Sequence, residues 1–188
     1  MKRALAAIGI AVVAAVVLSG CSVSIGSADP PVCLSQGRPG GPPMVLMAQS
    51  VPSASLIPCI SLVPAGWSVQ SFLARNNRAD FRLKSDIAGA RAVDIVLIHR
   101  CDVRGATQVP TDQPGTTRWE RILSINTGYR GTRYYTFPGG CVRYEFKLKG
   151  PARAAPVNDV SLAVDFVTRT QVAAEVTRQS HGRLHLDP

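Results

Sequence analysis

The segment RGTRYYTFPGGCVRYEFKL, residues 130–148, decides the fold. Two runs rich in aromatic and β-branched residues flank Pro138, Gly139 and Gly140, a pattern that predicts two antiparallel strands joined by a turn. In the second run apolar and polar residues alternate, which is typical of a sheet with one buried and one solvated face. The buried set is Val142, Tyr144, Phe146 and Leu148, and the solvated set is Cys141, Arg143, Glu145 and Lys147.

Three further strands are predicted upstream of this hairpin. Residues 79–84 alternate in the same way, and Asn76 and Asn77 form a turn before them. Residues 93–99 are more continuously apolar and suit a central strand, while residues 118–124 supply another. The apolar face of the first of these strands consists of Ala79, Phe81 and Leu83.

The C-terminal region changes its hydrophobic period and predicts helices. A short helix is expected from the spacing of Val160, Leu162, Ala163, Phe166 and Val167. The residues from Thr168 to Gln171 resemble a capping box that begins a second helix, which Gly182 would end before a short final strand at residues 184–186. Strands first and helices last predict an α+β fold, a mainly antiparallel sheet with one or two C-terminal helices packed on one face.

The chain divides into three predicted parts: a signal peptide at residues 1–20, a lipidated cysteine and flexible tether at 21–43, and one extracytoplasmic α+β domain at 44–188. The tether is rich in Ser, Gly and Pro and cannot build a core. Residues 44–64 are apolar but interrupted by Pro52, Pro58 and Pro64, which predicts short extended pieces instead of a helix.

The leader consists of Lys2 and Arg3, an apolar run at residues 4–18, and then Ser19, Gly20 and Cys21. An apolar helix of about 15 residues would cover only ~22 Å, short of the ~30 Å hydrocarbon core of a bilayer. This start resembles the lipobox signal of bacterial lipoproteins over residues 1–21. The resemblance implies cleavage before Cys21, a diacylglycerol thioether on its sulfur and N-acylation, typically by palmitate. It places the protein on the outer face of the cytoplasmic membrane. The alternatives are an ordinary signal peptide with an incidental cysteine and an uncleaved anchor.

Four cysteines remain after Cys21, and an even number in an exported chain indicates disulfides. We favour Cys33–Cys59 and Cys101–Cys141. Cys101 ends one predicted strand and Cys141 begins another, and the other two lie in neighbouring irregular stretches. The alternative is free buried thiols. The sequence has no C-x-x-C motif, which disfavours a zinc or redox centre.

The net charge is +9, and about +7 once Lys2 and Arg3 are removed with the leader. A basic exported domain is suited to anionic lipid headgroups or acidic cell-wall polymers, while export separates it from nucleic acid. The alternative is compositional, because 17 of the 21 basic residues are arginine, as in GC-rich genomes.

Two further stretches, VPSASLIPC followed by PAGW (residues 51–67) and FPGGC (137–141), resemble uncharacterised envelope proteins of actinobacteria. This resemblance implies no known activity.

The chain carries no nucleophile-elbow, dinucleotide-binding, phosphate-loop or zinc-protease motif, so we expect no cofactor and no metal. His181 and His185 stand four apart but lack an acidic partner. His99 and Asp102 form a weak candidate pair for acid–base chemistry, because residues three apart on a strand point to opposite faces. Asp94 is expected to face an open surface or to pair with an arginine.

The best candidate for a functional surface lies between residues 118 and 143, where arginines alternate with Trp119 and tyrosines. On one sheet face, such residues would bind phosphates or carboxylates and stack on sugars. The alternative is that the aromatics belong to the core and the arginines to its solvated counter-face. The proposed anionic-ligand surface comprises Arg118, Arg121, Arg130, Arg133, Arg143 and Tyr134.

Together these features predict a non-enzymatic lipoprotein that acts as a binding or accessory module in the cell envelope. Its expected partners are the membrane, reached through the lipid anchor, and either an envelope protein or an anionic envelope polymer. The alternative is a cell-wall hydrolase or transferase, which requires convergent catalytic groups that the sequence does not display.

Overall fold

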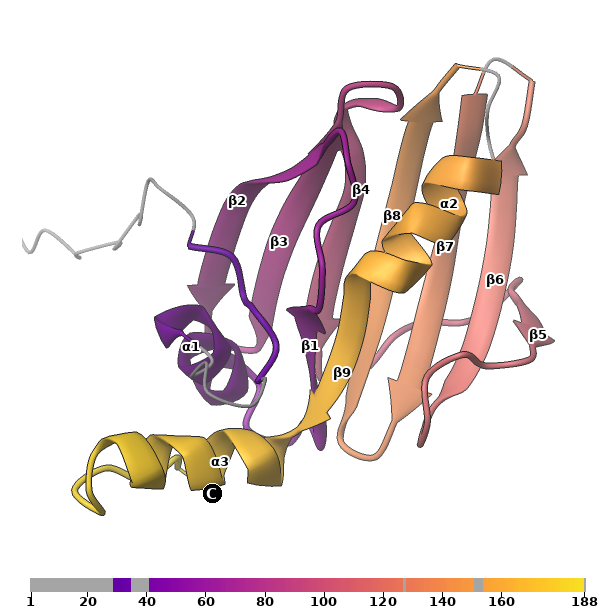
Figure 1. Ribbon diagram of the computed structural model, residues 1–188. Coiled ribbons are helices and arrows are strands. Elements are labelled where there is room, and N and C mark those ends of the chain that lie inside the picture. Colours follow the sequence, from indigo (N-terminus) through magenta and orange to yellow (C-terminus); the bar gives the residue numbers. More distant parts are fainter. Residues whose placement is uncertain (1–28, 35–40, 127, 151–153, 188) are drawn as a thin grey trace, which may run out of the picture.

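The computed structural model describes residues 29–34, 41–126, 128–150 and 154–187. It has the expected α+β fold, with three helices and nine strands in these residues (Figure 1). The elements are α1 (Pro42–Ser50), β1 (Leu56–Ile60), β2 (Trp67–Arg75), β3 (Arg78–Ser85), β4 (Gly89–Ile98), β5 (Thr107–Val109), β6 (Thr117–Ser124), β7 (Gly128–Phe137), β8 (Gly140–Lys149), α2 (Ala154–Ala163), β9 (Val164–Thr168) and α3 (Arg169–Gln179). The signal peptide, Cys21 and most of the predicted tether lie outside the described residues.

Seven of the strands form one antiparallel sheet in the order β2-β3-β4-β8-β7-β6-β5. The hairpin predicted from residues 130–148 is β7–β8, and it lies in the middle of this sheet. Strands β1 and β9 form a separate antiparallel pair. The turn at Asn76 and Asn77 is confirmed, since Asn77 adopts a φ of 63° between β2 and β3.

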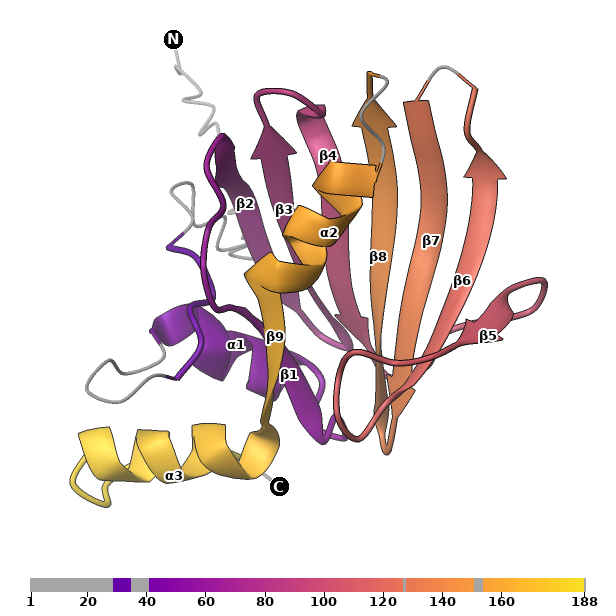
Figure 2. The same ribbon diagram turned by 45° about the vertical axis from the view of Figure 1, so that its right-hand side comes forward.

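The two faces of the sheet differ. On the covered face, apolar residues such as Phe81, Ile95 and Tyr144 are buried beneath α1, α2 and the β1–β9 pair (Figures 1 and 2). Helix α2 spans this face, because Asp159 accepts a 3.1 Å hydrogen bond from Trp67 on β2 and Ser161 accepts one of 2.6 Å from Arg133 on β7. The opposite, open face carries the polar residues of the alternating strands.

Part of the open face is also covered. The connection from β4 to β5 crosses behind β8 and β7 in Figure 1, and the disulfide between Cys101 and Cys141 fixes it there. Arg121 donates a hydrogen bond of 3.3 Å to the Arg104 carbonyl in this connection. The open face is therefore shielded at the end where β4 finishes.

The prediction that residues 44–64 contain no helix is wrong. Two prolines begin α1, where a missing N–H costs nothing, and Met44, Met47 and Ala48 form a buried stripe at helical spacing. The proline at position 52 follows the helix and does not interrupt it.

The predicted C-terminal helix is shorter than expected, because Phe166 and Val167 belong to β9. Pairing with β1, and ring contacts between Phe166 and Tyr135 at 5.2 Å, hold this segment extended. The capping box is confirmed, with Thr168 and Gln171 in reciprocal hydrogen bonds at the start of α3. That helix ends at Gln179, before Gly182, and residues 184–186 form no strand.

Both expected disulfides are present, Cys33–Cys59 and Cys101–Cys141. The first attaches part of the predicted tether to the domain, and a parallel bridge between Val32 and Ile60 reinforces it. Within the described residues, no helix combines the length and the apolar character needed to cross a membrane.

Candidate functional site

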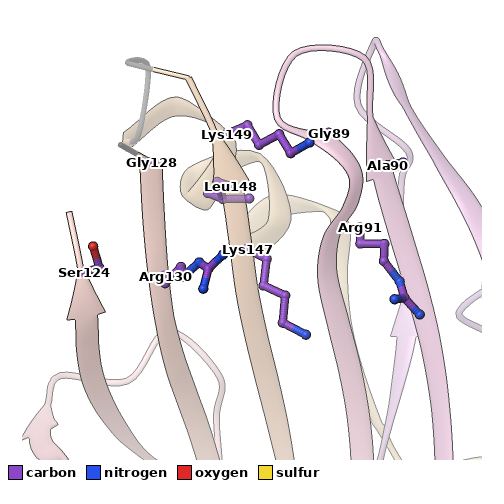
Figure 3. Close-up of a pocket in the computed structure, with 9 residues that line it drawn as sticks. All are labelled: Gly89, Ala90, Arg91, Ser124, Gly128, Arg130, Lys147, Leu148 and Lys149. Atoms are coloured by element: carbon purple, nitrogen blue, oxygen red, sulfur yellow. The ribbon is translucent and has the colours of Figure 1, made fainter. Parts of the chain in front are cut away.

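A basic hollow of about 620 Å³ lies at the end of the open face where β4 and β7 begin and β6 and β8 end (Figure 3). The residues that line this basic hollow are Gly89, Ala90, Arg91, Ser124, Gly128, Arg130, Lys147, Leu148 and Lys149.

The hollow arises because the sheet is interrupted there. Pairing of β4 with β8 runs from Ile98↔Cys141 to Val93↔Phe146, and the two chains meet again where Lys149 N–H donates to the Ala88 carbonyl at 2.9 Å. Between these points β4 contains a bulge. Leu83 pairs with Val93 and Ser85 with Gly89, so two residues along β3 correspond to four along β4. The extra residues, including Ala90 and Arg91, leave the plane of the sheet and are exposed.

Two glycines that line the hollow have positive φ and lie close to β8. Gly128 has a φ of 153°, and a Cβ there would lie 2.3 Å from the Leu148 carbonyl oxygen. Gly89 has a φ of 109°, and a Cβ there would contact the Lys149 side chain at 3.4 Å. A side chain at Gly128 would collide with the β8 backbone, whereas at Gly89 the contact is an ordinary one and the positive φ is what disfavours other residues.

Four cations line the hollow, and they are Arg91, Arg130, Lys147 and Lys149, all exposed. All 12 acidic residues of the chain lie in its described part, so their positions are known. In that part, no carboxylate forms an ion pair with Arg91, Arg130 or Lys149, while Lys147 has one at 3.9 Å, that of Asp94. Asp94 also forms an ion pair with Arg82, which is one of the two arrangements expected for it from the sequence. The hollow therefore has an excess of positive charge.

Arg130 and Lys147 lie directly opposite each other on β7 and β8, and Figure 3 shows their side chains next to one another. Like charges in this relation destabilise an antiparallel pair. An anion bound between them would remove that repulsion and form charge-assisted hydrogen bonds.

Three other residues of the predicted anionic-ligand surface lie elsewhere on the open face. Tyr134 is only 2% exposed and accepts a hydrogen bond of 2.7 Å from Arg121, whose guanidinium also lies 5.8 Å from the tyrosine ring centroid. Arg143 is half-buried and pairs with Glu145 at 2.7 Å. These groups already have partners, so they are poorly placed to hold a ligand.

The expectation that all six residues share one face is incorrect for Arg118 and Arg133. Strand register pairs Arg118 with Tyr135 and Arg133 with Tyr144, so both arginines lie on the covered face with these tyrosines. Both donate to Glu120, at 2.5 Å from Arg118 and 2.7 Å from Arg133. We call this the covered network; it comprises Arg118, Glu120, Arg133, Tyr135, Asp112 and Ser161.

The covered network is electrostatically satisfied. Burial alone would raise the pKa of Glu120, but hydrogen bonds and charge from Arg118 and Arg133 outweigh it and hold that pKa below its usual range. Burial raises the pKa of Tyr135, and its hydroxyl donates to Asp112 at 2.8 Å. The network accordingly pairs its charges internally and supports the fold.

The acid–base pair considered for His99 does not form. Hydrogen bonds from Arg104 lower the pKa of Asp102 to about 2, and His99 Nδ1 instead lies 2.9 Å from Ser53 Oγ. The Ser53 hydroxyl donates to the Gly139 carbonyl at 2.6 Å, so it is not directed at the imidazole as a nucleophile would be. Among the described residues, no group of three or more His, Cys, Asp or Glu is arranged to hold a metal.

Sequence reasoning identified Arg130 but missed Arg91, Lys147 and Lys149 as its neighbours. Lys147 was assigned to the polar face, yet the alternation that placed it there carries no information on which cation stands opposite.

Comparisons with known proteins give no match: no family model, no curated protein and no solved structure is significantly similar to this chain.

Proposed function

We propose that this protein is a lipid-anchored, extracytoplasmic binding module of the bacterial envelope and that its basic hollow binds anionic groups. The observation that carries the proposal is the cluster of four exposed cations, with Arg130 directly opposite Lys147 and three of the four without a carboxylate among the described residues. Phosphate and carboxylate groups match the donors that such a cluster offers.

Two other features support the envelope location. The lipobox pattern at residues 18–21 is that of an anchored lipoprotein, and the two disulfides suit an oxidising compartment. The anchor would hold the domain at the membrane surface, where anionic headgroups and acidic polymers are concentrated.

The proposal is tested by titrating the protein with inorganic polyphosphate in a calorimeter. Arg130→Gln combined with Lys147→Gln should weaken binding by about tenfold or more per cation, since a hydrogen bond to a charged group contributes about 1.5 kcal/mol. Binding should also weaken as salt is added, because the contacts are exposed to solvent.

A matched control is Arg75→Gln with Arg183→Gln, which removes the same charge from exposed residues outside the hollow. This variant should keep nearly all of the affinity. Equal losses in the two variants would show a response to net charge alone and would refute a site in the hollow.

A further inference from the structure

Large aliphatic side chains are exposed at the same end of the sheet as the basic hollow. Three lie at or just after the end of β6, namely Ile122 (61% exposed), Leu123 (65%) and Ile125 (50%), and Ile87 (75%) lies in the turn between β3 and β4. The intervening Ser124 lines the hollow, and Gly89 two residues after Ile87 does so too. Figure 1 shows both turns at the upper end of the sheet.

The exposure of Leu123 follows from the strand geometry. Ile122 pairs with Gly131 and Ser124 with Arg130, so Leu123 is the extra residue of a β-bulge and has no partner on β7. Bulges redirect side chains, and here the bulge leaves an aliphatic group exposed next to Ser124, the residue that pairs with Arg130.

Aliphatic groups at the same end of a sheet as a cluster of exposed cations form the kind of surface that a phospholipid bilayer binds. The cations contact headgroup phosphates while the aliphatic tips enter the boundary with the acyl chains. A soluble polyanion would use the cations but leave the aliphatic groups in water, and the buried core of a protein–protein interface is depleted in lysine. The combination therefore favours an anionic membrane over the other two partners.

The chain between the anchor and the domain is short. Seven residues separate Cys21 from Asp29, the first described residue, so the eight Cα–Cα steps between them reach at most about 28 Å when fully extended. The Cys33–Cys59 disulfide and the Val32–Ile60 bridge hold residues 32 and 33 against β1, so these residues add no length to the connection with the anchor. Figures 1 and 2 show the first described residues, in indigo, beside β2, so this reach allows the domain to contact the bilayer directly.

We propose that this end of the sheet docks on the anionic outer surface of the membrane that holds the lipid anchor. Arg91, Arg130, Lys147 and Lys149 bind headgroup phosphates, and Leu123 and Ile125 insert at the interface. The inference rests on the proposed function and deepens it, because it names the bilayer as the source of the anionic groups.

The test uses the full lipidated protein in vesicles, with an environment-sensitive fluorophore on Leu123→Cys. The control carries the same label on Leu184→Cys, an equally exposed leucine beyond α3. In phosphatidylcholine vesicles containing phosphatidylglycerol, the emission of the label at position 123 should shift to the blue. It should not shift in phosphatidylcholine alone, and the label at position 184 should shift in neither. Adding Arg130→Gln and Lys147→Gln should abolish the shift.

Each other outcome overturns the docking. Absence of a blue shift at position 123, an equal shift at position 184, or a shift that survives Arg130→Gln with Lys147→Gln would each refute it. If the label stays unshifted while polyphosphate still binds through Arg130 and Lys147, the docking fails but the proposed function stands. If polyphosphate binding also fails to depend on these residues, both fail. Circular dichroism of every variant confirms that the fold is retained.

Discussion

Glu120 is the residue on which the charge balance of the covered face depends. Its carboxylate accepts hydrogen bonds from both Arg118 and Arg133, and Arg133 is only 4% exposed beneath α2. The Arg133 guanidinium also lies 5.5 Å from the ring centroid of Phe146. A nearly buried cation is thus neutralised chiefly by one carboxylate, and its removal would leave that cation uncompensated.

We therefore expect Glu120→Gln to lower the free energy of unfolding by about 2 kcal/mol at neutral pH. The loss is smaller than the ~3–5 kcal/mol of a fully buried pair, because 22% of the Glu120 side chain is exposed. The arginines lower the pKa of Glu120 in the folded state, so its contribution is present above the ordinary glutamate pKa of about 4.3 and is lost as the pH falls through the folded value. Urea denaturation at several pH values measures both effects.

Glu145→Gln on the open face provides the comparison. Its ion pair with Arg143 is more exposed, with a third of the Glu145 side chain in solvent, and should contribute less than about 1 kcal/mol. If Glu120→Gln and Glu145→Gln change stability equally, the covered network does not have the importance given to it here.

The arginines show how far residue types alone predict a site. Arg118, Arg121, Arg130, Arg133 and Arg143 form one set in the sequence, yet strand register divides them between two faces. Alternation fixed the faces of residues 141–148 because every second residue there is apolar. In β6 and β7 polar residues occur on both faces, so the sequence carried no signal of which arginines were covered.

At the scale of elements, α3 illustrates a local signal that persists in the structure. Thr168 accepts a hydrogen bond of 3.1 Å from the Gln171 backbone N–H, and the Gln171 side chain accepts one of 2.8 Å from the Thr168 N–H. These bonds satisfy donors that the first turn of a helix otherwise leaves unpaired. The interaction spans three residues, so neighbouring sequence suffices to predict it.

Thr168→Ala should therefore lower the free energy of unfolding by about 1 kcal/mol, the usual effect of losing an N-cap side chain. Thr170→Ala, at an exposed position in the first turn of the same helix, should leave stability unchanged or slightly raised, because alanine has the higher helix propensity. Thermal unfolding followed by circular dichroism compares the two. A loss in Thr170→Ala as large as in Thr168→Ala would argue against the cap as the cause.

Elements that depend on distant partners were missed. Strand β9 forms because β1, more than a hundred residues earlier, pairs with it from Leu56↔Thr168 to Ile60↔Val164. The apolar spacing in this region is equally compatible with a helix, and only the pairing decides between them. Helix α1 was missed for a different reason. Pro52 and Pro58 were interpreted as breaks although both follow the helix, and the two prolines of its first turn were assigned to the tether.

For the molecule as a whole, the proposed location depends on the proposed lipid anchor at Cys21. Cys21→Ala should release the protein from membranes and abolish its labelling by a fatty-acid analogue, because the acylated sulfur would be absent. Fractionation of cells, together with detection of the label, measures both. Ser22→Ala is the matched control and should behave as the parent does. Unchanged partitioning and labelling in Cys21→Ala would show that the lipoprotein interpretation is incorrect.

The sequence by itself determined the α+β class, the β7–β8 hairpin and the start of α3, and it favoured the two disulfide pairings that the structure contains. These features depend on alternation, caps and turns, which are local, or on a cysteine pairing with few alternatives. Only the tertiary structure decided which cations share a site. The basic hollow requires the bulge in β4, the end of its pairing with β8 and the register that sets Arg130 opposite Lys147. Such contacts join strands far apart in the chain, and their register is set by packing of the whole sheet.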